Sequence, residues 1–188
     1  DEWHEAVLQQ AVRLVAPSQS VVGLVRKLDP RWKDTAIEVV HHGLTPLQGG
    51  KKVAPRPRPD GKLRIVIPGS IHAGKGQSLL LEALPELTRV AQVYLLGAGQ
   101  HGEAFYGRAG VNVILHYQRS DLPRLLQEIG PDLAALLSVV PETFSYTLSE
   151  MRQLGIPVIA TRVGSLAERI EDGRDGLLIE PTAQALLA

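Results

Sequence analysis

From residue 63 onward, short apolar runs alternate with longer stretches whose apolar residues recur every three or four positions. The short runs predict β-strands, and the longer stretches predict amphipathic helices. The expected strands are Leu63–Ile67, Val93–Leu96, Asn112–His116, Leu133–Leu137, Val158–Ala160 and Leu177–Ile179. The expected helices are Gly76–Val90, Asp121–Ile129, Tyr146–Leu154, Leu166–Glu171 and a last one from Thr182 onward. This alternation predicts an α/β fold with a doubly wound parallel sheet, Rossmann-like, which binds ligands at the carboxyl ends of its strands.

The first part of the chain carries a weaker version of the same pattern. Its expected elements are a helix over residues 1–12, a strand Arg13–Ala16, a helix Gln19–Leu28 and a strand Ile37–His41. The segment Thr45–Lys62 that follows is rich in Gly and Pro with interspersed Lys and Arg, and predicts an extended, solvated linker without a packed element. We therefore divide the chain into residues 1–44, a linker 45–62 and a domain 63–188.

The composition excludes several classes of protein. Hydrophobic residues make up 44% of the chain, which is enough for a proper core, and 20 basic residues balance 20 acidic ones. That balance argues against a nucleic-acid-binding protein that works through a basic field. The absence of cysteine excludes a disulfide framework and a thiol nucleophile. No apolar run approaches the length of a bilayer span, and a cytoplasmic protein is expected. The chain opens without Met and stops inside an expected helix, so we expect a piece of a larger protein.

Two glutamates flank the start of the expected helix Tyr146–Leu154. Ser145 is a suitable N-cap, Glu142 precedes it, and Glu150 lies inside the helix, at about 10 Å from Glu142. The free N–H groups and partial positive charge of a helix N-terminus suit a phosphate. A carboxylate on each side suits a sugar nucleotide, with Glu142 at the sugar and Glu150 at the ribose. On spacing alone, two merely solvated glutamates are the favoured interpretation.

The sequence around this glutamate pair resembles that of a known family. The blocks E-T-F-S-Y-T-L-S-E, G-I-P-V-I-A-T, V-G-S-L-A-E and D-G-R-D-G-L-L-I-E-P follow one another in residues 142–181. They resemble the C-terminal, donor-binding half of retaining GT-B glycosyltransferases of the glycosyl transferase group 1 family, also called GT4. Members of that family carry an E-x7-E pair, which Glu142 and Glu150 match.

The resemblance implies a function and its partners. The donor is a nucleoside-diphosphate sugar, the acceptor is a glycan or lipid-linked glycan, and the transfer retains configuration without a metal ion or other cofactor. Glu142 becomes the catalytic candidate, whether it attacks covalently or positions the sugar. Donor contacts are expected from Phe144, Ser145, Tyr146 and Thr147.

The same resemblance implies a wider setting for the chain. Residues 1–44 correspond to a remnant of the N-terminal, acceptor-side domain, whose missing part would carry the acceptor pocket. Polysaccharide biosynthesis is the expected pathway. Peripheral association with the inner face of the membrane is left open.

The block P-G-S-I-H-A-G-K-G follows the first expected strand of the domain. Gly69 permits a tight turn, and Lys75 at the entrance of the next helix can reach a diphosphate as a point charge. The resembling family has an arginine where Ser70 stands, in addition to the lysine. This chain therefore offers one cation where the family usually has two. Weaker donor binding follows, unless His72 compensates.

Gly97, Gly99 and Gly102 form a G-x-G-x-x-G pattern, and this supports an alternative. Such a pattern in the first βαβ unit is typical of an NAD(P)- or flavin-binding oxidoreductase. Here it follows the second strand of the domain, and Phe105–Gly110 is a poor helix. In the resembling family, Gly97 and Gly99 line the nucleotide cleft instead. A catalytically silent sugar-nucleotide-binding module is a third interpretation, kept open by Ser70.

Two further segments leave their roles open. The backbone around Gly164 either approaches the ligand, with Glu168 buttressing the site, or Ser165 simply caps the next helix. No D-x-D motif occurs, and the adjacent His41 and His42 at a strand end point to opposite faces, so they are poor joint metal ligands. No metal site is expected.

Overall fold

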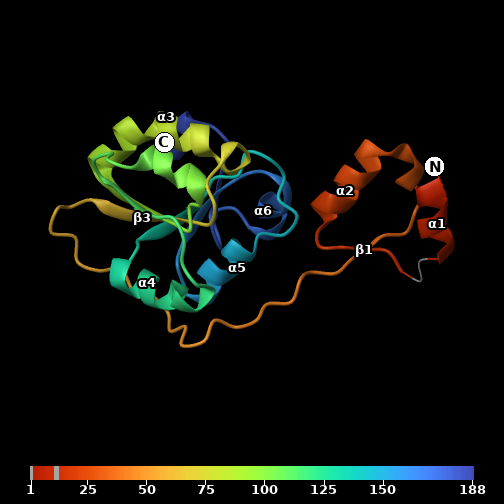
Figure 1. Ribbon diagram of the computed structural model, residues 1–188, viewed down its shortest axis with the longest axis horizontal. Coiled ribbons are helices and arrows are strands. Elements are labelled where there is room, and N and C mark those ends of the chain that lie inside the picture. Colours follow the sequence, from red (N-terminus) through yellow and green to blue (C-terminus); the bar gives the residue numbers. More distant parts are fainter. Residues whose placement is uncertain (1, 11–12) are drawn as a thin grey trace.

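The alternating pattern of residues 63–188 builds one parallel sheet. The computed structural model describes residues 2–10 and 13–188 (Figure 1). The strands are β3 (Leu63–Pro68), β4 (Ala91–Leu96), β5 (Val111–Ile114), β6 (Leu133–Leu136), β7 (Val158–Thr161) and β8 (Leu177–Ile179). They lie in the order β5-β4-β3-β6-β7-β8, and all neighbours pair in parallel. The predicted α/β fold is confirmed.

Helices cover both faces of this sheet. They are α3 (Gln77–Val90), α4 (Leu122–Ile129), α5 (Tyr146–Gln153), α6 (Gly164–Arg169) and α7 (Ala183–Leu187), with 3-10 segments η2 (Ala73–Lys75), η3 (Gln100–Phe105) and η4 (Arg119–Asp121). Figure 1 shows α3 over one face and α4 and α5 over the other. Side chains alternate along β3, so Ile65 belongs to the hydrophobic cluster that includes Leu80 of α3, while Val66 belongs to the one that includes Leu126 of α4. The two faces thus carry two separate hydrophobic clusters.

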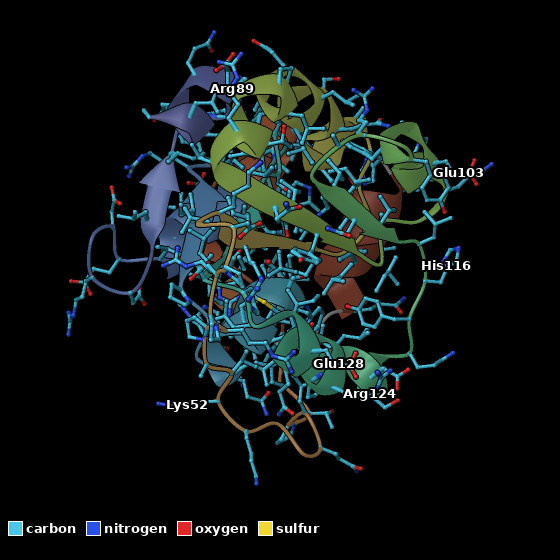
Figure 2. All side chains as sticks on the ribbon, turned by 90° about the vertical axis from the view of Figure 1, so that its left-hand side faces the viewer. Lys52, Arg89, Glu103, His116, Arg124 and Glu128 are labelled. Atoms are coloured by element: carbon cyan, nitrogen blue, oxygen red, sulfur yellow. The ribbon has the colours of Figure 1, made fainter. Side chains whose placement is uncertain are left out.

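Charged side chains lie on the outer surfaces of these layers. Figure 2 shows Arg89 of α3 and Arg124 and Glu128 of α4 at the edge of the molecule. Arg124 and Glu128 form an i,i+4 ion pair of 2.8 Å in which both side chains are exposed. Pairs of this kind contribute little stability, so these surfaces only need to stay solvated.

The strand order reverses next to β3. The chain runs from β3 through β4 to β5 at one edge, then crosses back to β6 and continues through β7 to β8 at the other edge. β3 and β6 are therefore neighbours whose following loops diverge to opposite sides. In open α/β sheets, ligands bind at this switch point, outside the carboxyl ends of the strands.

The N-terminal part forms a small β-α-β unit. It contains α1 (Glu2–Gln10), β1 (Val15–Ala16), α2 (Gln19–Leu28), η1 (Pro30–Trp32) and β2 (Glu38–Val39), with β1 and β2 paired in parallel. The expected helix over residues 1–12 includes positions 1, 11 and 12, which lie outside the described residues. Both strands are two residues long, shorter than expected. The unit lies beside α6 (Figure 1), where the Glu168 carboxylate accepts hydrogen bonds of 3.0 and 2.9 Å from the N–H groups of Gln19 and Ser20.

The segment 45–62 is only partly an extended linker. Leu47 and Val53 are buried in the cluster beneath α5. The Val53 N–H also donates to the Leu154 carbonyl at 2.8 Å. No helix or strand forms between Thr45 and Lys62, as expected, but two apolar side chains among the Gly and Pro residues reach the core. The boundaries at 44 and 62 stay a prediction.

Element ends differ from expectation by a few residues. Ala91 and Gln92, which were expected in a loop, belong to β4. This strand begins directly after α3 ends at Val90. α6 begins two residues earlier than expected and ends at Arg169. Within the described part of the chain, no helix combines the length and apolar character needed to cross a membrane.

Candidate functional site

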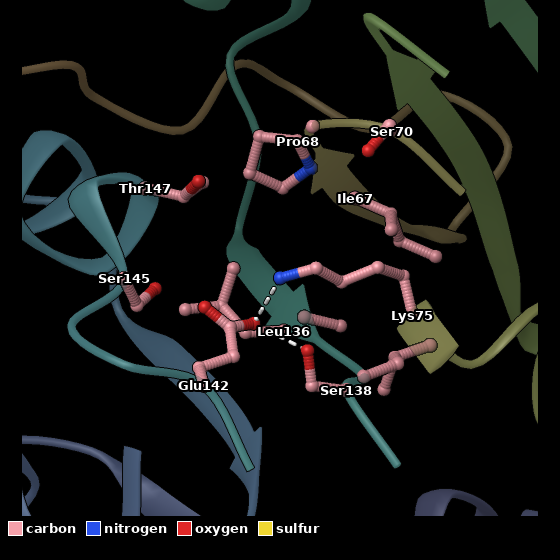
Figure 3. A pocket seen from close by; sticks show the side chains of 12 residues that line it. Ile67, Pro68, Ser70, Lys75, Leu136, Ser138, Glu142, Ser145 and Thr147 are labelled. Atoms are coloured by element: carbon pink, nitrogen blue, oxygen red, sulfur yellow. Dashed lines mark hydrogen bonds and ion pairs between the residues drawn. The ribbon is translucent and has the colours of Figure 1, made fainter. Parts of the chain in front are cut away.

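A pocket of about 220 Å³ lies at the switch point between β3 and β6 (Figure 3). Its walls are the carboxyl ends of both strands, the loop after β3 and the segment that leads into α5. Six of the residues expected in the site line it, namely Gly69, Ser70, Lys75, Glu142, Ser145 and Thr147. The sequence therefore identified most of the polar lining.

An ion pair occupies the centre of the pocket. The Nζ of Lys75 lies 2.7 Å from Oε1 of Glu142, with the two side chains 34% and 14% exposed. The Ser138 hydroxyl donates to the same carboxylate oxygen. Figure 3 shows the lysine reaching across the pocket toward Glu142. The two residues that the sequence assigned to phosphate and sugar are thus in direct contact.

Gly76 explains how Lys75 reaches this position. It has a φ of +80°, and a Cβ there would lie 2.2 Å from the carbonyl oxygen of Leu137. Only glycine combines that backbone conformation with so close an approach. The end of η2 is thereby pressed against the chain that leaves β6, which aims Lys75 into the pocket.

Glu142 is held through its backbone as well. The Ser165 N–H donates to the Glu142 carbonyl at 3.0 Å, and a Cβ on Gly164 would lie 2.5 Å from the Glu142 nitrogen. The close approach expected of Gly164 is therefore to the Glu142 loop. Ser165 does not cap α6, since it lies inside the helix, whose N-cap position is Val163. Glu168 does not line the pocket and binds α2 instead.

The start of α5 is as predicted. Ser145 is the N-cap, and its hydroxyl accepts a hydrogen bond of 3.3 Å from the Leu148 N–H. Its φ is +65°, which makes it the one non-glycine residue with a positive φ among residues 2–10 and 13–188. The first N–H groups of a helix have no intrahelical carbonyl partner, so those of Tyr146 and Thr147, which precede the capped Leu148 N–H, are available to an anion in the pocket.

The two aromatic residues around Ser145 point away from the pocket. Phe144 is buried beneath the Arg169 guanidinium, whose central carbon lies 3.8 Å from the ring centroid. Tyr146 is half exposed and stacks on His42 with ring centroids 5.4 Å apart. Neither side chain lines the pocket. Donor contact by these two residues stays a prediction.

Glu150 lies in a second, separate environment. Its buried carboxylate is 2.7 Å from Nε of Arg119, and Nη2 of the same arginine donates to the Thr45 carbonyl at 3.0 Å. Tyr117 is close by, and burial, followed by the charge of Glu150, raises the pKa of its phenol. Sequence reasoning missed both Arg119 and Tyr117. The available signal was their place in the loop directly after β5.

Gly97 belongs to this second environment, whereas Gly99 lies beside Ser70 of the pocket. A Cβ on Gly97 would lie 2.7 Å from the Tyr117 ring, and one on Gly99 would lie 3.9 Å from Cβ of Ser70. The glycine pattern opens on η3, a short 3-10 segment, rather than on a long helix. A dinucleotide fingerprint needs that helix N-terminus for its pyrophosphate, so the geometry does not favour the oxidoreductase alternative.

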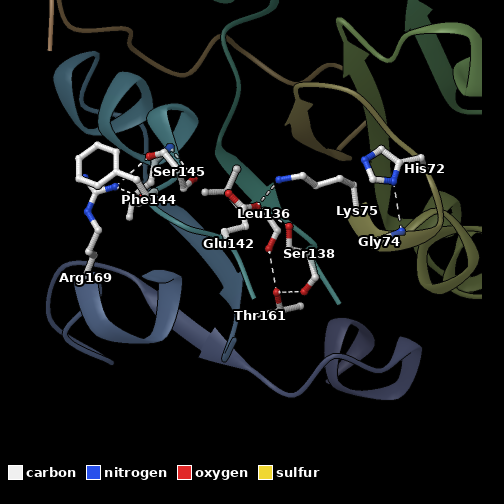
Figure 4. A network of polar contacts seen from close by, with 11 residues as sticks. His72, Gly74, Lys75, Leu136, Ser138, Glu142, Phe144, Ser145, Thr161 and Arg169 are labelled. Atoms are coloured by element: carbon white, nitrogen blue, oxygen red, sulfur yellow. Dashed lines mark hydrogen bonds and ion pairs between the residues drawn. The ribbon is translucent and has the colours of Figure 1, made fainter. Parts of the chain in front are cut away.

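The histidines have structural contacts. Nδ1 of His72 accepts a hydrogen bond of 3.2 Å from the Gly74 N–H and closes the turn at η2 (Figure 4). His41 and His42 both pack against Phe144, at ring-centroid distances of 5.8 and 5.1 Å. In the part of the chain that the structure describes, no three His, Asp or Glu side chains are grouped so that they could hold a metal ion.

Comparisons with known proteins agree with this geometry. The family model described as "Glycosyl transferases group 1" matches residues 62–188. A D-inositol 3-phosphate glycosyltransferase of Arthrobacter sp. (strain FB24) is 31% identical over 133 residues, which are 65% of this chain and 32% of that protein.

Solved structures share the fold. Anabaena Alr3699/HepE in complex with UDP and glucose is similar with a TM-score of 0.73 and 21% identity, over 96% of this chain and 53% of that one. Sucrose-phosphate synthase from Thermosynechococcus elongatus is similar with a TM-score of 0.76 and 20% identity, over 98% and 49%. The chain thus spans about a third of the curated relative and about half of these structures. The sheet order is that of the Rossmann-like half of a GT-B fold, and the chain belongs to the glycosyl transferase group 1 family.

Proposed function

We propose that this chain is the donor-binding part of a glycosyltransferase. The enzyme would transfer a sugar from a nucleoside-diphosphate sugar to a glycan or lipid-linked glycan. The observation that carries the proposal is the convergence of Lys75, Glu142 and the N-terminus of α5 on one pocket at the switch point. Support comes from the family and from similar structures that were solved with UDP or UDP-glucose.

Each part of the site takes one part of the donor. Lys75 and the first N–H groups of α5 hold the diphosphate, because a cation and a helix N-terminus both favour a phosphate. Glu142 accepts hydrogen bonds from hydroxyls of the sugar. Glu150, at the second environment, accepts from the ribose. Donor binding therefore requires Lys75 to exchange its contact with Glu142 for one with phosphate.

The same groups act during transfer. The bond between the anomeric carbon and the diphosphate oxygen breaks, and negative charge develops on the departing nucleoside diphosphate. Lys75 and the N–H groups of α5 are already in place to stabilise that charge, which is how preorganised dipoles lower a barrier. Retention of configuration and independence of a metal ion or other cofactor are part of the proposal, through the E-x7-E pair.

The remaining parts of the reaction are assigned to the acceptor-side domain. Residues 1–44 supply its last β-α-β unit, and the acceptor pocket would lie beyond it. A role in polysaccharide biosynthesis, in the cytoplasm at the inner face of the membrane, stays a prediction.

Calorimetric titration of the 188-residue chain with UDP, GDP, dTDP and NAD tests the proposal. We expect one nucleoside diphosphate to bind. Lys75→Ala should weaken that binding at least about tenfold, since hydrogen bonds to charged groups contribute about 1.5–3 kcal/mol. The matched control is Lys27→Ala, which removes an exposed lysine on α2 and should leave the affinity unchanged.

Three outcomes contradict the proposal. Binding of NAD without any nucleoside diphosphate favours the oxidoreductase. Equal affinities of the chain and of Lys75→Ala place the diphosphate outside this pocket. The absence of all binding at millimolar concentration leaves a module that does not hold a donor.

A further inference from the structure

Arg169, on the short helix α6, makes an unusual set of contacts (Figure 4). Its Nη1 donates to the carbonyl of Phe144 and, at 2.9 Å, to that of Ser145. Its Nη2 donates to the Ser149 hydroxyl at 2.6 Å. The guanidinium also lies over the Phe144 ring. The Arg169 side chain thus forms hydrogen bonds both to the turn before α5 and to the first turn of α5 itself.

These contacts fall on the one strained residue at the pocket. Ser145 has a φ of +65°, a conformation that costs a residue with a side chain about 1–2 kcal/mol. Such strain persists only where the surroundings hold it, and it is typical of sites where geometry matters for function. Ser145 lines the pocket, and its conformation sets the direction in which the first N–H groups of α5 point.

The hydrogen-bond partners of Arg169 differ from those of the arginines that form surface ion pairs. Arg124, Arg162 and Arg174 all pair with carboxylates at the surface. Among the hydrogen bonds described for Arg169, the acceptors are two carbonyls and a hydroxyl, all of them neutral. Burial, followed by the nearby charge of Arg152, lowers the pKa of Arg169. Desolvation of the guanidinium opposes folding. In exchange, the hydrogen bonds of Arg169 hold the turn before α5 in one geometry.

We propose that Arg169 is a positioning residue for the donor diphosphate. It holds Ser145 in the left-handed conformation and thereby keeps the N-terminus of α5 turned toward the pocket. The planar fork of arginine reaches two carbonyls and a hydroxyl together, and lysine has no equivalent geometry. This inference rests on the proposed function, since it assumes that the pocket binds phosphate.

The test is a rescue experiment, with inorganic pyrophosphate and UDP as probes. Arg169→Ala should weaken the binding of both probes about 5- to 30-fold, which is the affinity equivalent of the strain at Ser145. Adding Ser145→Gly to Arg169→Ala should restore the affinity to within about threefold of that of Ser145→Gly alone. Glycine adopts the left-handed conformation without penalty, and as an N-cap it costs only a few tenths of a kcal/mol.

Three further variants serve as controls. Ser145→Gly alone is the reference for the double variant, because it carries any loss of affinity that comes from the missing Ser145 hydroxyl rather than from Arg169. Arg169→Lys keeps the charge without the fork and should resemble Arg169→Ala, which separates geometry from electrostatic attraction. Arg174→Ala removes an exposed arginine of the following loop and should change nothing. Unfolding midpoints show whether each variant is folded, and the lysine variant carries the test if Arg169→Ala is not.

The inference is overturned if Arg169→Ala and Arg169→Lys bind both probes like the original chain. It is equally overturned if they bind weakly and Ser145→Gly restores nothing. Failure of the proposed function has a different signature, in which the original chain binds neither probe. Hydrogen exchange at the Ser149 and Glu150 amides then still reports on the turn, with faster exchange expected in Arg169→Ala and recovery in the double variant.

Discussion

The two glutamates of the E-x7-E pair have the same kind of partner and very different surroundings. Glu142 pairs with Lys75 and Glu150 pairs with Arg119, each at 2.7 Å. In the Glu142 region, the backbone at Gly76 packs against Leu137 and the backbone at Gly164 packs against Glu142 itself. The Glu150 region is closed by side chains, and one of them reaches the linker at Thr45.

This difference separates the two ends of the proposed donor. The residues proposed to bind the phosphates and the sugar lie within residues 63–188, on segments that pack directly against the sheet. The nucleoside end depends on Arg119 and Tyr117 and on where the linker lies. The first end is expected to be rigid before any ligand arrives, and the second is expected to adapt.

The largest expected effect comes from adding a methyl group at each end. Gly76→Ala should lower the free energy of unfolding by about 3 kcal/mol or more, because its Cβ meets the Leu137 backbone carbonyl at 2.2 Å. Gly97→Ala should cost about half as much, because its Cβ meets the Tyr117 ring, which can move. Urea denaturation measures both. Gly107→Ala is the control, with a φ of +70° and nothing within 4 Å.

That control isolates the cost of the backbone conformation from the cost of the contact. If Gly76→Ala and Gly107→Ala are equally destabilised, the close packing at Lys75 contributes nothing. If Gly97→Ala costs as much as Gly76→Ala, the two ends are equally rigid and the contrast between them is lost.

Removing the charge of Glu142 should strengthen phosphate binding. Glu142→Gln keeps the shape of the side chain, frees Lys75 from its ion pair and removes a negative charge beside the pocket. We expect the affinity for pyrophosphate to rise about tenfold. The reason is that removing a negative charge a few ångströms from the bound phosphate removes a repulsion of at least that size near a protein surface. Titration with pyrophosphate measures it. Weaker binding by this variant would place the phosphates away from Lys75.

The matching change at the other end should have the opposite sign and a smaller size. Glu150→Gln should weaken the nucleoside diphosphate about three- to fivefold, since an amide is a poorer acceptor for ribose hydroxyls than a carboxylate. Pyrophosphate, which has no ribose, should bind as before. An equal loss for both ligands would show damage to α5 rather than a lost ribose contact.

The smallest effect is expected from Tyr117 and only in alkali. Burial raises its pKa in the folded chain above the ordinary value of 10.0. As the pH rises beyond about 10, the unfolded chain loses the phenolic proton first, so stability falls. Tyr117→Phe should remove this contribution, as seen in urea midpoints compared between about pH 8 and pH 10.5. Tyr106→Phe, at an exposed tyrosine, should keep the alkaline loss of the original chain.

Much of the fold followed from local patterns. The alternation of apolar runs predicted all six strands, and the cap at Ser145 predicted where α5 begins. Loops after strands share one edge of a parallel sheet, so Lys75 and Glu142 were correctly expected at one site. Patterns of this kind work because they depend on residues close together in the sequence.

The missed features depend on residues far apart. The contact of Arg169 with Phe144 and that of Arg119 with Glu150 join segments about 25 and 31 residues apart, and a charged residue in a loop or short helix carries no sign of its partner. The burial of Leu47 and Val53 was missed because Gly and Pro dominate their surroundings. The pairing of Lys75 with Glu142 was missed because each was assigned to a different part of the ligand.

The neighbouring position of β3 and β6 has a consequence for how the pocket forms. Ile65 stands opposite Leu133, with β4, β5 and their connections lying between them in the chain. Pairings over such a distance form slowly, because a long loop must close before any contact is gained. During synthesis, β3 can pair with β4 first, but the pocket can form only after β6 and the start of α5 have left the ribosome. A ligand that requires this pocket therefore cannot assist the earlier stages of folding.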